Sequence, residues 1–263
     1  MKETIKLKQA FKTAYANKGL FLLSCVLDII LFLIYGFATA PIYNKLLAHI
    51  NLIGSNAGTA VQEATRYSQG FFSILAHESI KPYLYKIALL LLLLAATVYL
   101  IYCILQAINW KIALQMTGKK IRYLDYFKKF LIINIIWFIL YIIYYLLVLA
   151  VDLRKILITT IAQAQPSSVL NIILTFYLII IAYFAAISYI QLSVKKSWQT
   201  GTKKIKQLFP SVLLIAAYLM LINIITGQLI YFNPIIGMIT GTILLIPAFT
   251  IGRIYISLLI NKT

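Results

Sequence analysis

The sequence predicts an all-α integral membrane protein, a bundle of transmembrane helices that forms a single domain over residues 1–263. Hydrophobic residues make up 62% of the chain and charged residues 11%, whereas soluble domains have about 45–50% apolar and about 25% charged residues. Six apolar stretches reach the length of about 20 residues at which a helix crosses a bilayer. Polarity does not alternate along them as it would in barrel strands, so helices are expected.

The six stretches are expected to form three consecutive helical hairpins. They are residues 19–40, 87–109, 130–151, 169–192, 208–231 and 235–260. The longest connection, residues 41–86, is shorter than the roughly 50 residues at which independent domains begin. No separate soluble domain is therefore expected.

The first stretch is expected to remain in the protein as a span. Ala38-Thr39-Ala40 has the form of a signal-peptide cleavage site, so a five-span mature form is the alternative. The stretch is longer than the about 7–15 apolar residues of a signal, Pro41 would follow the cut, and Asp28 interrupts the apolar run.

Basic residues are distributed unevenly between the two sets of connections. Of the 24, 17 lie before the first stretch, between the second and third, between the fourth and fifth, or after the last. Because cytoplasmic loops carry the excess of Lys and Arg, a cell-membrane protein with both termini in the cytoplasm is expected. This topology explains most of the net charge of +18. Nucleic acid is not an expected partner, since no base-stacking module is recognisable.

A basic amphipathic segment precedes each hairpin: KETIKLKQAFKTAYANK, GKKIRYLDYFKKF and VKKSWQTGTKKIKQLF. Apolar residues at helical spacing among lysines are typical of helices that lie in the membrane interface. Three interfacial helices are expected on the cytoplasmic surface, the alternative being that each is only the charged end of a span. The lysines expected to contact anionic lipid headgroups are Lys8, Lys12, Lys119, Lys120, Lys128, Lys129, Lys195, Lys196, Lys203 and Lys204.

The segments also suggest an internal repeat, because Thr117-Gly118 and Thr200-Gly201 occupy matching points in the second and third. In the long connection, apolar residues at spacings of three and four over residues 61–75 predict an amphipathic helix on the outer surface.

Four polar residues within the stretches form a possible intramembrane site: Asp28, Asn134, Asn223 and Arg253. A carboxylate at the centre of a span costs about 2.5–3.5 kcal/mol, so it commonly marks a proton relay, an ion site or a pairing contact. Hydrogen bonding to Tyr or Asn that serves packing alone is the favoured interpretation. Arg253 is expected to extend to the cytoplasmic headgroups, with a reach toward Asp28 as the alternative.

The last stretch contains two features that bear on helix packing. Gly237 and Gly241 form a small-x-x-x-small pair that permits close helix contact. Pro247 is expected to kink the helix, since it removes one backbone hydrogen bond.

Catalytic and metal-binding patterns are not found, so no enzyme activity, cofactor or metal is expected. Neither His-Glu-x-x-His nor Gly-x-Ser-x-Gly occurs, and Gly118-Lys119 lacks the upstream glycine of a phosphate-binding loop. His49 and His77 are interpreted as loop residues because zinc needs at least three protein ligands. Cys25 and Cys103 are expected to be free thiols.

The segments TGKKIRYLDYFKKF and VKKSWQTGTKKIKQLF resemble those of a loose group of six-span proteins of archaea and bacteria. That group is related to the membrane portion found beside some glycerophosphodiester phosphodiesterases. The resemblance implies a prokaryotic protein with this topology over the whole chain. It implies no catalytic residue, since the hydrolase of such proteins is a separate domain.

These observations favour a membrane scaffold or accessory protein that contacts anionic lipid and other membrane proteins. The alternative is a small-solute or proton-coupled transporter that uses Asp28 and the kink at Pro247. An enzyme that acts on lipid is a third hypothesis.

Overall fold

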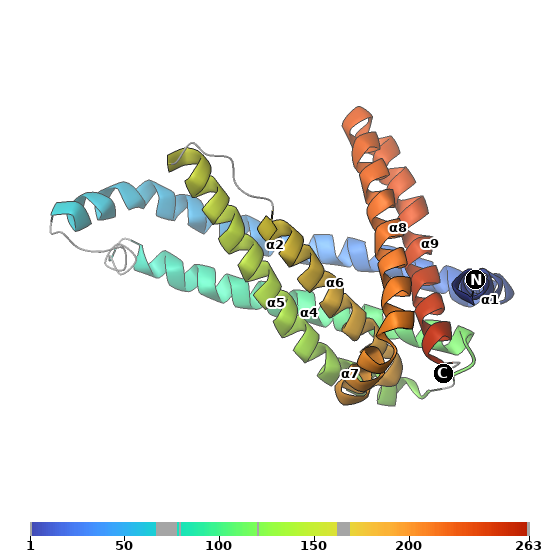
Figure 1. Cartoon of the computed structure of the whole chain (residues 1–263). Helices are drawn as coiled ribbons and strands as arrows, with labels where there is room; N and C mark the ends of the chain where they lie inside the picture. Colours follow the sequence, from blue (N-terminus) through green and yellow to red (C-terminus); the bar gives the residue numbers. More distant parts are fainter. Residues whose placement is uncertain (1, 67–77, 79, 120, 162–168, 262–263) are drawn as a thin grey trace. The chain divides into compact units, whose positions relative to one another are not determined.

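The computed structural model describes residues 2–66, 78, 80–119, 121–161 and 169–261 (Figure 1). The regular structure within these ranges is entirely helical, and two compact units are distinguished, Met1–Ile29 with Cys103–Thr263 and Ile30–Tyr102. The helices are α1 (Lys2–Ala16), α2 (Lys18–Arg66), α4 (Lys81–Met116), α5 (Tyr123–Ile161), α6 (Val169–Gln191), α7 (Val194–Lys203), α8 (Ile205–Phe232) and α9 (Pro234–Asn261).

Six of the described helices are long and apolar enough to cross a bilayer, which confirms the predicted fold class. The candidate spans are Lys18–Ile53, Lys81–Met116, Tyr123–Asp152, Val169–Gln191, Ile205–Phe232 and Pro234–Ile260. Large apolar side chains on them are exposed, for example Leu92, Ile132 and Met220. A lipid environment removes such side chains from water without protein burial, so the protein is an integral membrane protein.

In the unit Ile30–Tyr102, α2 continues through Pro41 to Arg66, so this helix does not end at residue 40, where the first span was predicted to end. Proline removes one hydrogen bond from a helix interior, and neighbouring turns can maintain the helix around it. His49 therefore lies in a helix and not in a loop, with its ring 6.0 Å from that of Tyr83. His77 and most of the amphipathic helix predicted over residues 61–75 lie outside the described residues.

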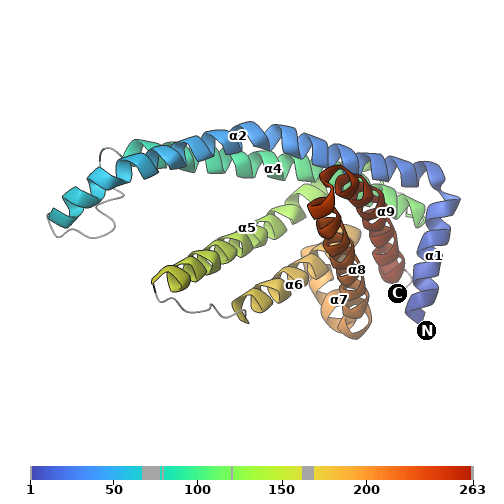
Figure 2. The same ribbon diagram turned by 90° about the horizontal axis from the view of Figure 1, so that it is seen from above.

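In the larger unit, α8 and α9 form an antiparallel hairpin around a tight turn (Figures 1 and 2). The Asn233 side-chain oxygen accepts hydrogen bonds from the backbone N–H groups of Ile235 and Ile236 and so caps α9. A Cβ atom at Gly237 would lie 2.5 Å from the backbone nitrogen of Ile230. The close helix contact predicted for this glycine is confirmed.

Two of the three predicted interfacial helices are separate helices. Figure 1 looks along α1 nearly end-on while α8 and α9 run across the view, so α1 lies at a steep angle to both. α7 is a helix of 10 residues that packs against α6.

Between the second and third spans, the structure agrees with the alternative prediction: the basic segment leads into the charged start of a span and forms no separate helix. The chain turns after α4 at Gly118, whose φ is +92°, and α5 begins at Tyr123. The basic residues Lys128 and Lys129 are exposed on the first turns of α5 itself. A short segment leading directly into an apolar run continues the same helix, because only a breaking residue would separate the two.

Candidate functional site

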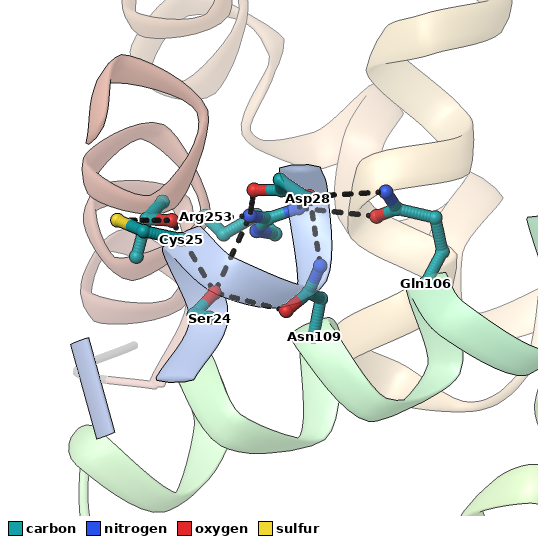
Figure 3. Close-up of polar contacts among 7 residues, drawn as sticks. Ser24, Cys25, Asp28, Gln106, Asn109 and Arg253 are labelled. Carbon is teal, nitrogen blue, oxygen red and sulfur yellow. Dashed lines mark hydrogen bonds and ion pairs between the residues drawn. The ribbon is translucent and has the colours of Figure 1, made fainter. Parts of the chain in front are cut away.

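A buried ion pair joins Asp28 of α2 to Arg253 of α9 inside the larger unit (Figure 3). Arg253 Nη1 donates to Asp28 Oδ1 at 3.1 Å, and Nη2 donates to Oδ2. The two residues are 2% and 7% exposed. The headgroup position expected for Arg253 is therefore wrong, and the alternative reach toward Asp28 is what the structure contains.

Two amides of α4 complete the coordination of this pair. Asn109 Nδ2 donates to Asp28 Oδ1 at 2.7 Å, and Gln106 Nε2 lies 3.4 Å from the same oxygen. Gln106 Oε1 accepts from Arg253 Nη1 at 3.1 Å. Each amide thus presents its donor to the carboxylate, and Gln106 also presents its acceptor to the guanidinium.

Two hydroxyl groups surround the other side of the guanidinium. Arg253 Nη2 lies 3.2 Å from Thr250 Oγ1 and 3.4 Å from Ser24 Oγ. Ser24 in turn donates to Asn109 Oδ1 at 3.0 Å. The six side chains form one network across three helices, and all six are buried.

Helical spacing explains how the sequence builds this network. Ser24 and Asp28 share a face of α2 one turn apart, as do Gln106 and Asn109 on α4. Thr250 and Arg253 do the same on α9. The predicted polar site did not include Ser24, Gln106, Asn109 or Thr250, although paired polar residues one turn apart in an otherwise apolar helix are a signal that could have identified them.

The network neutralises two charges inside an apolar helix bundle. An intramembrane charge is tolerated when it faces the bundle interior and is paired. Two buried polar atoms of α9, Arg253 Nε and Ser257 Oγ, have no hydrogen-bond partner within the described part of the chain. They lie one helical turn apart, so the polar stripe of α9 continues beyond the ion pair.

The other two residues of the predicted polar site are not part of this network. Asn134 accepts a hydrogen bond from the Tyr189 hydroxyl at 2.6 Å and donates to Cys103 Sγ at 3.0 Å. Asn223 is exposed, and its backbone carbonyl accepts from the Thr226 hydroxyl. Of the four predicted residues, the structure therefore brings Asp28 and Arg253 together and places Asn134 and Asn223 elsewhere.

Asn134 belongs to a second cluster, which joins α4, α5 and α6. The ring of Tyr189 lies 4.6 Å from that of Phe130 and 5.4 Å from that of Trp110. Trp137 Nε1 donates to the Ser188 hydroxyl at 2.8 Å. Since the aromatic polar groups find partners within the bundle, this cluster is structural.

The cysteines are free, as predicted. Cys25 Sγ lies 3.7 Å from Thr250 Oγ1, whereas Cys103 contacts Asn134. The two thiols thus have different surroundings.

The predicted headgroup lysines are mostly exposed. Those of α1, α7 and the start of α5 are Lys8, Lys12, Lys128, Lys129, Lys195, Lys196 and Lys203, with Lys119 in the turn before α5. Lys204 is half-buried, and Lys120 lies outside the described residues. Exposure leaves these ammonium groups available to the membrane surface.

Among the described residues, no group of three or more His, Cys, Asp or Glu side chains could hold a metal ion. Comparison with protein-family models, curated proteins and solved structures found nothing that matches this chain. The resemblance to the six-span group beside phosphodiesterases stays a prediction.

Proposed function

We propose that this chain is a non-enzymatic membrane scaffold or accessory protein that holds basic amphipathic helices at the anionic inner surface of the cell membrane. The observation that carries the proposal is the packing of α1 and α7. Each helix has small buried residues toward the bundle and lysines with aromatic residues outward. Helices of this kind bind the interface through buried apolar area and attraction to anionic lipid.

On α7, the buried face is defined by Ser197 and Gly201. The Tyr183 hydroxyl of α6 donates to the Gly201 carbonyl at 2.8 Å, and a Cβ atom at Gly201 would lie 2.6 Å from the Phe184 ring. Trp198 stacks on Phe184 at 4.5 Å and remains 58% exposed. The glycine thus permits close docking, while Trp198 and the neighbouring lysines remain available to lipid.

On α1, Ala10 and Ala14 are buried in the packing against α9. Phe11 and Tyr15 are exposed, as are Lys8 and Lys12. An apolar groove of about 430 Å³ lies beside this helix and includes Leu7, Phe11 and Pro247 in its walls. α1 therefore has the amphipathic character of a helix in the interface plane.

The test uses Trp198 as a reporter, since Trp110 and Trp137 are 6% and 7% exposed. The protein is reconstituted in nanodiscs of brominated phosphatidylglycerol or brominated phosphatidylcholine. Bromine quenching of Trp198 is expected to be stronger in the anionic lipid, and the difference should vanish in a Lys195→Gln, Lys196→Gln, Lys203→Gln variant. A Lys81→Gln, Lys86→Gln variant is the control. Equal quenching of the unmodified protein in both lipids would contradict the proposal.

A transporter that uses Asp28 is the second candidate, supported by the position of a carboxylate inside a span. Among the described residues, the Asp28 carboxylate accepts hydrogen bonds from Gln106, Asn109 and Arg253. A proton carrier at this position would have to break the ion pair with Arg253. Unchanged solute or proton flux in proteoliposomes of an Asp28→Asn variant would exclude a transport role for this residue.

A further inference from the structure

A basic pocket of about 340 Å³ lies where α4 ends and the chain turns toward α5. Its lining residues are Lys111, Gln115, Lys119, Ile121 and Arg122. Three of these five side chains are positively charged, so the pocket is strongly basic.

The C-terminal cap of α4 brings these residues together. Lys119 N–H donates to the Leu114 carbonyl at 3.0 Å and Gly118 N–H to the Gln115 carbonyl at 3.1 Å. This pair of hydrogen bonds, with Gly118 at positive φ, is a Schellman motif. The motif reverses the chain, so that Lys119 returns beside Lys111, which lies one turn before Gln115 on α4.

The cap also satisfies the carbonyl groups that the lysines could otherwise bind. The Leu114 carbonyl accepts from the Thr117 hydroxyl at 2.9 Å in addition to backbone N–H groups. Within the described ranges, neither Lys111 nor Lys119 forms an ion pair with a carboxylate. Arg122 reaches Asp125 only at 4.0 Å, with both side chains largely exposed.

The surroundings of the three cations favour an anion. Lys111 Nζ lies 5.3 Å from the Tyr123 ring centroid. Although much of Lys119 is exposed, partial desolvation lowers the pKa of its ammonium below the ordinary value, because desolvation disfavours the charged form. A bound anion would compensate for the water that Lys119 has lost.

We propose that this pocket binds a phosphate group, with Lys111, Lys119 and Arg122 contacting its oxygens and Gln115 donating a further hydrogen bond. Arginine and lysine are the side chains that recognise phosphate, Arg in bidentate geometry and Lys as a point charge. The phosphate belongs either to an anionic lipid headgroup or to a soluble phosphate compound. The lipid form of this proposal rests on the proposed function, which places this turn at the inner membrane surface.

The test measures two probes on the full chain. Inorganic phosphate is titrated into the protein in neutral detergent by calorimetry, and phosphatidic acid binding is counted by native mass spectrometry. Lys119→Gln and Lys111→Gln are each expected to weaken binding about tenfold or more, as expected for one charge-assisted contact. Lys119→Arg should retain most of the affinity. Lys81→Gln, which removes the same charge from the exposed start of α4, should change it less than twofold.

The outcomes separate the sources of phosphate. Binding of both probes shows a general phosphate site, binding of phosphatidic acid alone a headgroup site, and binding of inorganic phosphate alone a site for a soluble compound. The proposal is overturned if neither probe binds, or if Lys81→Gln weakens binding as much as Lys119→Gln. Helix content and melting temperature of each variant show whether it is folded. Failure of the α7 quenching test leaves these affinities unchanged, so the two proposals fail independently.

Discussion

Asp28 and Arg253 stabilise the larger unit only as a pair, because each charge alone would be buried among apolar helices. Both carboxylate oxygens accept hydrogen bonds, and the Gln106 and Asn109 amides are oriented by the pair. Removing one partner from a buried pair leaves an uncompensated charge and costs about 3–5 kcal/mol, whereas replacing both by apolar residues can be nearly neutral.

Asp28→Asn is therefore expected to lower the free energy of unfolding by about 3–5 kcal/mol, since Arg253 loses its counter-charge. The double variant Asp28→Leu, Arg253→Met should lose less than the sum of the single Asp28→Leu and Arg253→Met variants. Denaturation of each variant in the same detergent provides the values. Additive losses would show that the two charges are not coupled.

Residue-scale contacts were the least predictable part of the site. The sequence indicates the depth of Asp28 and Arg253 along their helices, but not which way each helix faces. The contact spans 225 positions of the chain and depends on helix packing. Asn134 and Asn223 are both asparagines in apolar stretches, yet Asn134 is buried and Asn223 is exposed.

At the scale of elements, the two matched Thr-Gly pairs have different structural roles. Gly118 ends α4 in a left-handed conformation, whereas Gly201 lies within α7 and allows it to approach Phe184. A repeated short motif therefore does not predict the same backbone conformation, because the packing around each glycine determines its structural role.

Gly201→Ala is expected to destabilise the docking of α7 by about 1–3 kcal/mol, because its Cβ would overlap the Phe184 ring. Gly227→Ala on α8 is the control, since nothing lies within 4 Å of a Cβ at that position. Replacing an unobstructed helical glycine should instead stabilise by about 0.5–1 kcal/mol. Proteolysis within α7 and thermal melting measure the two effects. A stable Gly201→Ala variant would mean that α7 is not closely docked.

The presence of the helices was predictable, because a run of about 20 apolar residues spans the bilayer as a helix that satisfies its own backbone hydrogen bonds. The ends of the helices were less predictable. α2 continues past Pro41 since a single missing hydrogen bond does not terminate a helix with apolar neighbours. The second amphipathic segment merges with α5 because no residue there breaks the helix after Tyr123.

At the scale of the whole molecule, an apolar surface and an uneven charge distribution together determine placement in the bilayer. Exposed leucine and isoleucine side chains cover the candidate spans, and basic residues cluster at alternate connections. The orientation of the chain in the membrane is a prediction, and labelling of single cysteines from one side of the membrane can test it.

In a Cys25→Ser, Cys103→Ser background, an Asn233→Cys variant should react with a membrane-impermeant maleimide in intact cells. A Lys203→Cys variant should react only after permeabilisation, because α7 is expected on the cytoplasmic side. Labelling followed by gel-shift analysis reports both. The reverse pattern would invert the topology and remove the basis for contact with the anionic inner leaflet.

The ion pair of Asp28 with Arg253 links the second helix of the chain to the last helix described, and this has a consequence for biosynthesis. While the ribosome is still making the intervening spans, Asp28 is already inserted and has no guanidinium to meet. A nascent chain arrested before α9 would keep that carboxylate without its partner. The network around Asp28 can therefore close only after α9 has been synthesised.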